Sequence, residues 1–106
     1  MSDSEVQRFL QVVQMRLSKA RRKSGLTQEE AADRAQLPVR TYQGLEGIRD
    51  GRKFNPTLLT LYAASSAVGI ELATLVEPPE KEDLQTLELT FKLKSSRRAK
   101  LTSRKP

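Results

Sequence analysis

The chain has 106 residues, of which 37% are apolar and only 5% aromatic, and its formal net charge is +6. This length allows one small domain and at most an arm, and the scarcity of aromatic residues argues against a large aromatic-lined pocket. The absence of cysteine and histidine excludes disulfides, the two commonest zinc ligands and the usual general base of hydrolases. Because no glycine-rich phosphate loop and no convincing pair of carboxylates is present either, we expect no enzyme activity, no cofactor and no metal site.

The first five residues are acidic and polar, unlike a secretory signal. No apolar run approaches the roughly 18 residues that a membrane helix needs. A chain without cysteine also agrees with a reducing compartment. We therefore expect a cytoplasmic protein that does not associate with membranes.

Basic residues are concentrated in two parts of the chain. Residues 8–53 carry 11 Lys/Arg against 5 Asp/Glu, and residues 81–106 carry 8 against 3. A basic balance of this kind indicates a nucleic-acid or other anionic partner.

The first half of the chain predicts three helices. Apolar residues from Val6 to Ala20 recur at helical spacing, and Gly25 is typical of a residue just after a helix end. Thr27 and Glu30 have the spacing of a capping box, which begins a short second helix. Pro38 ends that helix and fits the first turn of a third, from about Val39 to Glu46, with Tyr42 and Leu45 facing inward.

A basic loop at 47–55 precedes two more predicted helices. Asn55-Pro56 reads as an N-cap followed by proline at the first helical position. We expect the fourth helix, which ends near Val68, to point most of its large side chains inward: Leu58, Leu59, Leu61 and Tyr62, together with Ala64. A last short helix covers about Glu71 to Leu75.

The period of the pattern changes after the Pro78-Pro79 pair. Four apolar residues alternate strictly with polar ones, and this period predicts a β-strand over about 86–93. The four apolar residues are Leu87, Leu89, Phe91 and Leu93. A lone strand leaves its backbone groups unpaired, so the simplest partner is the same strand of a second copy. Docking of the strand on its own helices is the alternative. We therefore divide the chain into a helix-turn-helix domain (1–79), a linker and dimerising strand (80–94) and a basic disordered tail (95–106), which is a flexible phosphate-binding arm or only a solvated extension.

Two short helices joined by a tight turn are typical of proteins that read DNA. The N-terminus of the second helix favours a phosphate, and the third helix can enter the major groove, where arginine pairs with guanine and glutamine with adenine. The candidate DNA-binding residues are Thr27, Gln28, Val39, Arg40, Thr41, Gln43, Gly44, Arg49, Arg52 and Lys53.

From Phe9 to about Pro78 the chain resembles the Xre/Cro-C1 family of phage and bacterial repressors. The resemblance is carried by "SKARRKSGLTQEEAADRA", Leu45-Glu46 and "LLTLYAASSAVGIELATLV" after Pro56. It implies an all-α, five-helix Cro/C1 repressor-like domain, with a buried ion pair between Arg21 and Glu46. The chain departs from the family pattern in Gln36, where glycine is usual, in Tyr42, where an aliphatic residue is usual, and in a longer loop before Pro56.

These observations favour a transcriptional regulator, expected to be a repressor, that binds a pseudo-palindromic operator in double-stranded DNA as a homodimer. An antitoxin that regulates its own operon and binds a toxin through the C-terminal segment is the alternative. A nucleoid protein without sequence preference is a third interpretation.

Overall fold

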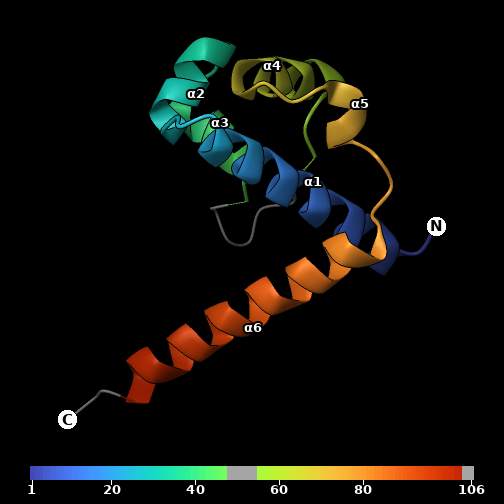
Figure 1. The fold of residues 1–106 in the computed structure, drawn as a ribbon, viewed down its shortest axis with the longest axis vertical. Helices are drawn as coiled ribbons and strands as arrows, with labels where there is room; N and C mark the ends of the chain where they lie inside the picture. The colour runs from blue at the N-terminus through green and yellow to red at the C-terminus, as the bar shows by residue number, and fades with distance from the viewer. Residues whose placement is uncertain (48–54, 104–106) are drawn as a thin grey trace.

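The computed structural model describes residues 1–47 and 55–103, with the side chains of 91 and 94–103 excepted. This part of the chain consists of helices α1 (Asp3–Lys23), α2 (Gln28–Ala35), α3 (Val39–Leu45), α4 (Leu58–Val68), α5 (Leu72–Leu75) and α6 (Lys81–Ser103). Helices α1 to α5 form a small bundle, and α6 extends away from it (Figure 1). The all-α prediction for the first 79 residues is therefore confirmed in the described residues.

Helix α1 begins three residues before the predicted start. Ser2 caps it, since its hydroxyl accepts a hydrogen bond from the Glu5 N–H at 3.2 Å. The helix ends at Lys23 with Ser24 as its C-cap, and Gly25 follows with a φ of +74°, the left-handed conformation that glycine adopts without steric cost. Val13 and Leu17 lie in the hydrophobic core.

The turn between α2 and α3 contains a strained residue. Gln36 has φ 57° and ψ 42°, the left-handed conformation that is costly for any residue with a Cβ. Its backbone N–H donates to Asp33 O, and the next N–H, of Leu37, donates to Ala32 O. Pro38 then precedes α3, so the helix-turn-helix has the expected boundaries.

Helix α4 differs from its prediction in two respects. It begins at Leu58 with Thr57 as N-cap, because the Thr57 hydroxyl accepts from the Thr60 N–H and so replaces the predicted Asn55 cap. Its first residues are only partly covered: Leu58, Leu59 and Tyr62 are exposed, whereas Leu61 packs against the core and Ala64 is buried. The inward placement of Leu58, Leu59 and Tyr62 was therefore wrong.

The predicted C-terminal strand was also wrong, because residues 81–103 form helix α6. The Asp83 carboxylate accepts from the Glu80 N–H at 3.0 Å, and the Thr86 hydroxyl donates to Glu82 O, both within the first turns of a helix. A helix satisfies its backbone groups internally, which a lone strand cannot do. Residues 95–103, predicted to be disordered, belong to the same helix.

The predicted dimerising residues consequently lie on different faces of α6. Leu87 is buried on the side that packs against α1, whereas Leu89 and Leu93 are more than half exposed. Phe91 belongs to the same helix, and only its backbone position is described. No row of four apolar side chains faces one partner, as an extended strand would have presented it.

Arg16 of α1 attaches the start of α6 to the bundle. Its guanidinium donates to Glu77 O at 2.6 Å and Leu75 O at 3.2 Å, and it pairs with the Asp83 carboxylate at 2.8 Å. The backbone N–H of Glu80 and the hydrogen bond from Arg16 lower the pKa of Asp83. One side chain thus binds carbonyls at and after the end of α5 and the first turn of α6.

Candidate nucleic-acid interface

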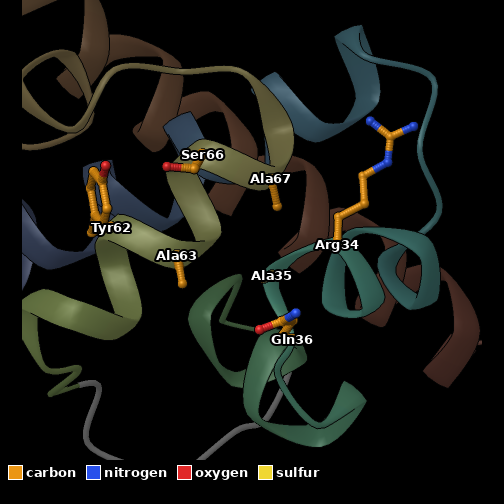
Figure 2. A pocket seen from close by; sticks show the side chains of 7 residues that line it. All are labelled: Arg34, Ala35, Gln36, Tyr62, Ala63, Ser66 and Ala67. Atoms are coloured by element: carbon orange, nitrogen blue, oxygen red, sulfur yellow. The ribbon is translucent and has the colours of Figure 1, made fainter.

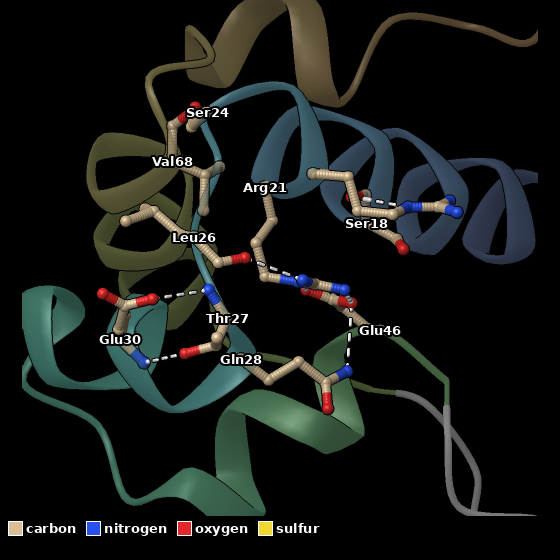
Figure 3. A network of polar contacts seen from close by, with 10 residues as sticks. Ser18, Arg21, Ser24, Leu26, Thr27, Gln28, Glu30, Glu46 and Val68 are labelled. Carbon is tan, nitrogen blue, oxygen red and sulfur yellow. Dashed lines mark hydrogen bonds and ion pairs between the residues drawn. The ribbon is translucent and has the colours of Figure 1, made fainter.

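The N-terminus of α2 is closed by the predicted capping box. The Glu30 carboxylate accepts from the Thr27 N–H at 2.9 Å, and the Thr27 hydroxyl accepts from the Glu30 N–H at 3.1 Å (Figure 3). The backbone hydrogen bond from Thr27 lowers the pKa of Glu30. The N–H groups of the first helical turn have no partner within the helix, which is the arrangement that attracts anions.

The ionic side chains of Arg21 and Glu46 connect α1 to the residue that follows α3. Arg21 Nε lies 2.8 Å from Glu46 Oε2, and Arg21 Nη2 donates to Glu46 Oε1 at 3.1 Å. The two side chains are only 14% and 2% exposed. A third guanidinium nitrogen donates to Leu26 O at 2.9 Å, so Arg21 also holds the loop before α2.

Gln28 joins the same network at the start of α2. Its amide Nε2 donates to Glu46 Oε1 at 3.1 Å, and Figure 3 shows the amide reaching across from α2 to the carboxylate. Burial on its own raises the pKa of Glu46, but hydrogen bonds from its neighbours, chiefly from Arg21, outweigh burial and leave that pKa lowered. One carboxylate therefore connects α1, α2 and α3 and fixes the angle between the two helices of the motif.

Tyr42 of α3 lies in the hydrophobic core of the bundle. The side chain is completely buried, and its hydroxyl meets no hydrogen-bond partner among the residues that the structure describes. Burial, followed by the nearby Glu46 carboxylate, raises the pKa of the phenol. Leu45, also buried, completes the inward face of the helix.

The outward face of α3 carries most of the candidate base-reading residues. Val39, Arg40 and Thr41 are exposed, whereas Gln43 and Gly44 are half-buried. The first turn of α3 thus presents a guanidinium, a hydroxyl and an aliphatic side chain together. Arg49, Arg52 and Lys53 fall within 48–54 and lie outside the described residues.

The described residues form neither a metal site nor a membrane-spanning helix. Among the described residues, no group of three or more His, Cys, Asp or Glu is arranged to hold a metal ion. None of the helices in 1–47 and 55–103 is both long and apolar enough to cross a membrane.

The chain is similar to a transcriptional regulator among the known proteins. No family model matches the chain, and no solved structure matches it. An uncharacterised HTH-type transcriptional regulator of Sinorhizobium fredii (strain NBRC 101917 / NGR234), y4dJ, is 36% identical over 69 residues, which make up 65% of this chain and 84% of that protein. The chain belongs to the HTH-type transcriptional regulators. The aligned length is close to that of the helical unit before α6.

Two features of this HTH-type regulator were missed in the sequence. The contact between Gln28 and Glu46 joins residues 18 positions apart, and no local pattern announces it. The role of Arg16 was missed because its partners are mainly backbone carbonyls, which the residue types of a sequence do not reveal. Both contacts govern how the elements of the regulator are oriented.

Proposed function

We propose that this HTH-type regulator is a sequence-specific DNA-binding repressor of the Xre/Cro-C1 type, which binds a pseudo-palindromic operator as a homodimer. The proposal rests on one observation: the Glu46 carboxylate accepts hydrogen bonds from both Arg21 and Gln28. It sets α2 and α3 at a fixed angle while leaving the first turn of α3 exposed. A rigid reading helix with an exposed N-terminal half is what entry into the major groove requires.

Within that proposal the first turn of α3 reads bases. Arg40 pairs with a guanine, because a guanidinium matches the two acceptors on the guanine edge. Val39 and Thr41 contact thymine methyl groups. Gln43 is half-buried, so its approach to an adenine depends on which side chains surround it when DNA is bound.

The start of α2 binds the phosphate backbone. Thr27 and Gln28 lie at the positive end of the helix dipole, which favours an anion. One N–H of the Gln28 amide donates to Glu46, which leaves the second for a phosphate oxygen. Such contacts position the protein and carry no sequence information. We assign Arg49, Arg52 and Lys53 to the same task from their place in the sequence.

The antitoxin alternative loses part of its support, and the nucleoid-protein alternative predicts a different behaviour with DNA. The antitoxin alternative places the toxin contact on the C-terminal strand or tail, and residues 81–103 are helical, so a contact through a strand loses its support. A nucleoid protein would bind DNA strongly but without sequence preference. We therefore propose the regulator alone.

Selection of random duplex DNA on the full-length protein, at near-physiological salt, tests the proposal. We expect a two-fold symmetric consensus with half-sites about one helical turn apart. Arg40→Ala should relax the preference at one position of each half-site and weaken binding by about 1–3 kcal/mol. Arg8→Ala is the matched control, since Arg8 is an exposed arginine in the first half of α1. Retention of DNA without any consensus would contradict the proposal.

A further inference from the structure

Helix α6 has its charged residues sorted by sign. Residues 81–88 include three acidic residues and one basic, whereas residues 89–103, the basic arm, include five basic residues and no acidic one. The five are Lys92, Lys94, Arg97, Arg98 and Lys100. Basic residues near the C-terminus of a helix interact favourably with its dipole, but this effect is confined to the last turn. Four of the five come before the last turn, so the helix dipole does not account for them.

The spacing of these basic residues is unfavourable for an isolated helix. Residues three and four positions apart are neighbours on a helix, and like charges at these spacings repel. Lys94 comes three positions before Arg97 and four before Arg98, and Arg97 comes three before Lys100. Only Lys92 has an acidic residue at either spacing. A polyanion that lies along the helix would convert this repulsion into attraction.

The basic arm leaves the bundle from a fixed base. Arg16 binds the carboxylate of Asp83 in the first turn of α6, and Leu87 is buried, whereas the described side chains at 88–90 and 92–93 are exposed. From Leu87 to Ser103 the helix rises about 24 Å, roughly the length of seven base pairs of DNA. In Figure 1 both α1 and α6 run from the right of the view to the left, the side on which α2 and α3 lie. The arm therefore ends on the same side of the molecule as the helix-turn-helix.

A shallow groove between the C-terminal end of α2 and α4 is a weaker candidate for binding an anionic partner. It has a volume of about 390 Å³, and small side chains such as Ala63 and Ala67 line it (Figure 2). Of the residues that line it, only Arg34 is charged. A nucleic acid is bound by several cations spaced along its backbone, which the basic arm provides and the groove does not.

We propose that the basic arm of α6 binds the phosphate backbone of DNA beside the half-site that α3 reads. The inference rests on the proposed function, because DNA that α3 enters continues past the half-site and presents phosphates there. Contacts of this kind add affinity without sequence preference and steepen the salt dependence of binding. A helix that lies on a membrane needs an apolar face beside its basic one, but of residues 94–103 only Ala99 and Leu101 are apolar.

Fluorescence anisotropy of a duplex that extends past the half-site, measured over a salt series with the full-length protein, tests the inference. We expect Arg97→Gln/Arg98→Gln to flatten the slope of log affinity against log salt by about one to two, since each phosphate contact contributes about 0.9. Glutamine is as good a helix former as arginine, and circular dichroism checks that helicity is kept. Arg8→Gln/Lys81→Gln is the matched control, because it removes two exposed basic residues outside the arm and lowers the net charge equally. An arm variant with the wild-type slope would overturn the inference.

The length of the duplex tests where the arm binds. On a duplex trimmed to the half-site itself, the wild-type protein loses the flanking phosphates, so it should bind with the same salt slope as Arg97→Gln/Arg98→Gln. A difference in slope that persists on the trimmed duplex would overturn the placement of the arm beside the half-site.

These measurements separate the inference from the proposed function. If the arm variant has a flatter slope but the wild-type protein selects no consensus from random DNA, the proposed function fails and phosphate binding by the arm stands. If the protein selects a consensus and the arm variant keeps the wild-type slope, the inference fails and sequence-specific binding stands. Vesicles of phosphatidylserine and phosphatidylcholine test the other anionic surface. Vesicle binding that only the arm variant loses, together with an unchanged DNA slope, would assign the arm to a membrane and overturn the inference.

Discussion

The Glu46 carboxylate lies 2.8 Å from the Arg21 guanidinium, and its side chain is only 2% exposed. Removing one partner of a buried ion pair leaves the other without compensation, which costs several kcal/mol. We expect Glu46→Ala to lower the free energy of unfolding by about 3 kcal/mol, as measured by urea denaturation. Asp33→Ala, at an exposed acidic position on α2, is the control and should change stability little. Equal effects of the two substitutions would show that the ion pair contributes nothing to the fold.

The pH dependence of stability should report the same carboxylate. Its folded-state pKa lies below the ordinary value of 4.5, so the unfolded chain binds the proton more readily. The stabilisation is therefore complete above pH 4.5 and is lost as the pH falls through the folded-state pKa. Glu46→Gln does not titrate, so its stability should fall less steeply than that of the wild-type protein between about pH 5 and pH 3. Parallel curves from thermal melts would contradict this assignment.

Gln36 holds the turn of the motif in a left-handed conformation, with φ 57°. Glycine adopts this conformation without the clash between Cβ and the backbone, which costs roughly 1–2 kcal/mol. We expect Gln36→Gly to raise the free energy of unfolding by about 1 kcal/mol. Gln36→Ala keeps the Cβ and should bring no comparable gain. A destabilised glycine variant would mean that the Gln36 side chain makes a compensating interaction.

The helix-turn-helix was predictable because its signals are local. A capping box, the glycine after α1 and the proline before α3 each act within a few residues, and the structure contains all three. Gln36 stands where the family pattern has glycine, and it adopts the left-handed conformation that glycine favours. Boundaries of this kind depend on backbone geometry that neighbouring side chains determine.

The two errors have a common physical cause. The apolar residues from 87 to 93 alternate, but Leu84, Leu87 and Phe91 also have the spacing of one helical face. Only tertiary contacts decide between the two periods, here the anchoring of Asp83 by Arg16. In α4 apolar residues lie on all sides of the helix, so their pattern does not show which side packs against the bundle.

Two glycines near the end of α3 should respond to alanine in opposite ways. Gly47 has φ +76°, and a Cβ there would lie 2.9 Å from Gln14 Nε2, whereas a Cβ at Gly44 meets no atom within 4 Å. Gly47→Ala is expected to destabilise the fold by about 1–2 kcal/mol, and Gly44→Ala to stabilise it by about 0.5–1 kcal/mol, because alanine is the better helix former. Urea denaturation of both variants compares them directly, and effects of the same sign would contradict the geometry.

Arg16 should control the attachment of α6 independently of the rest of the bundle. Its guanidinium binds Glu77 O, Leu75 O and the Asp83 carboxylate, and hydrogen bonds to charged groups are worth about 1.5–3 kcal/mol. Arg16→Met keeps the aliphatic stem and removes these bonds. We expect amide hydrogen exchange within residues 84–93 to accelerate while exchange in α2 changes little, because local opening lowers protection only in the segment that detaches. Arg22→Met, at an exposed arginine of the same helix, is the control. Uniform acceleration across the domain would instead mean that Arg16 stabilises the whole bundle and that α6 is not released separately.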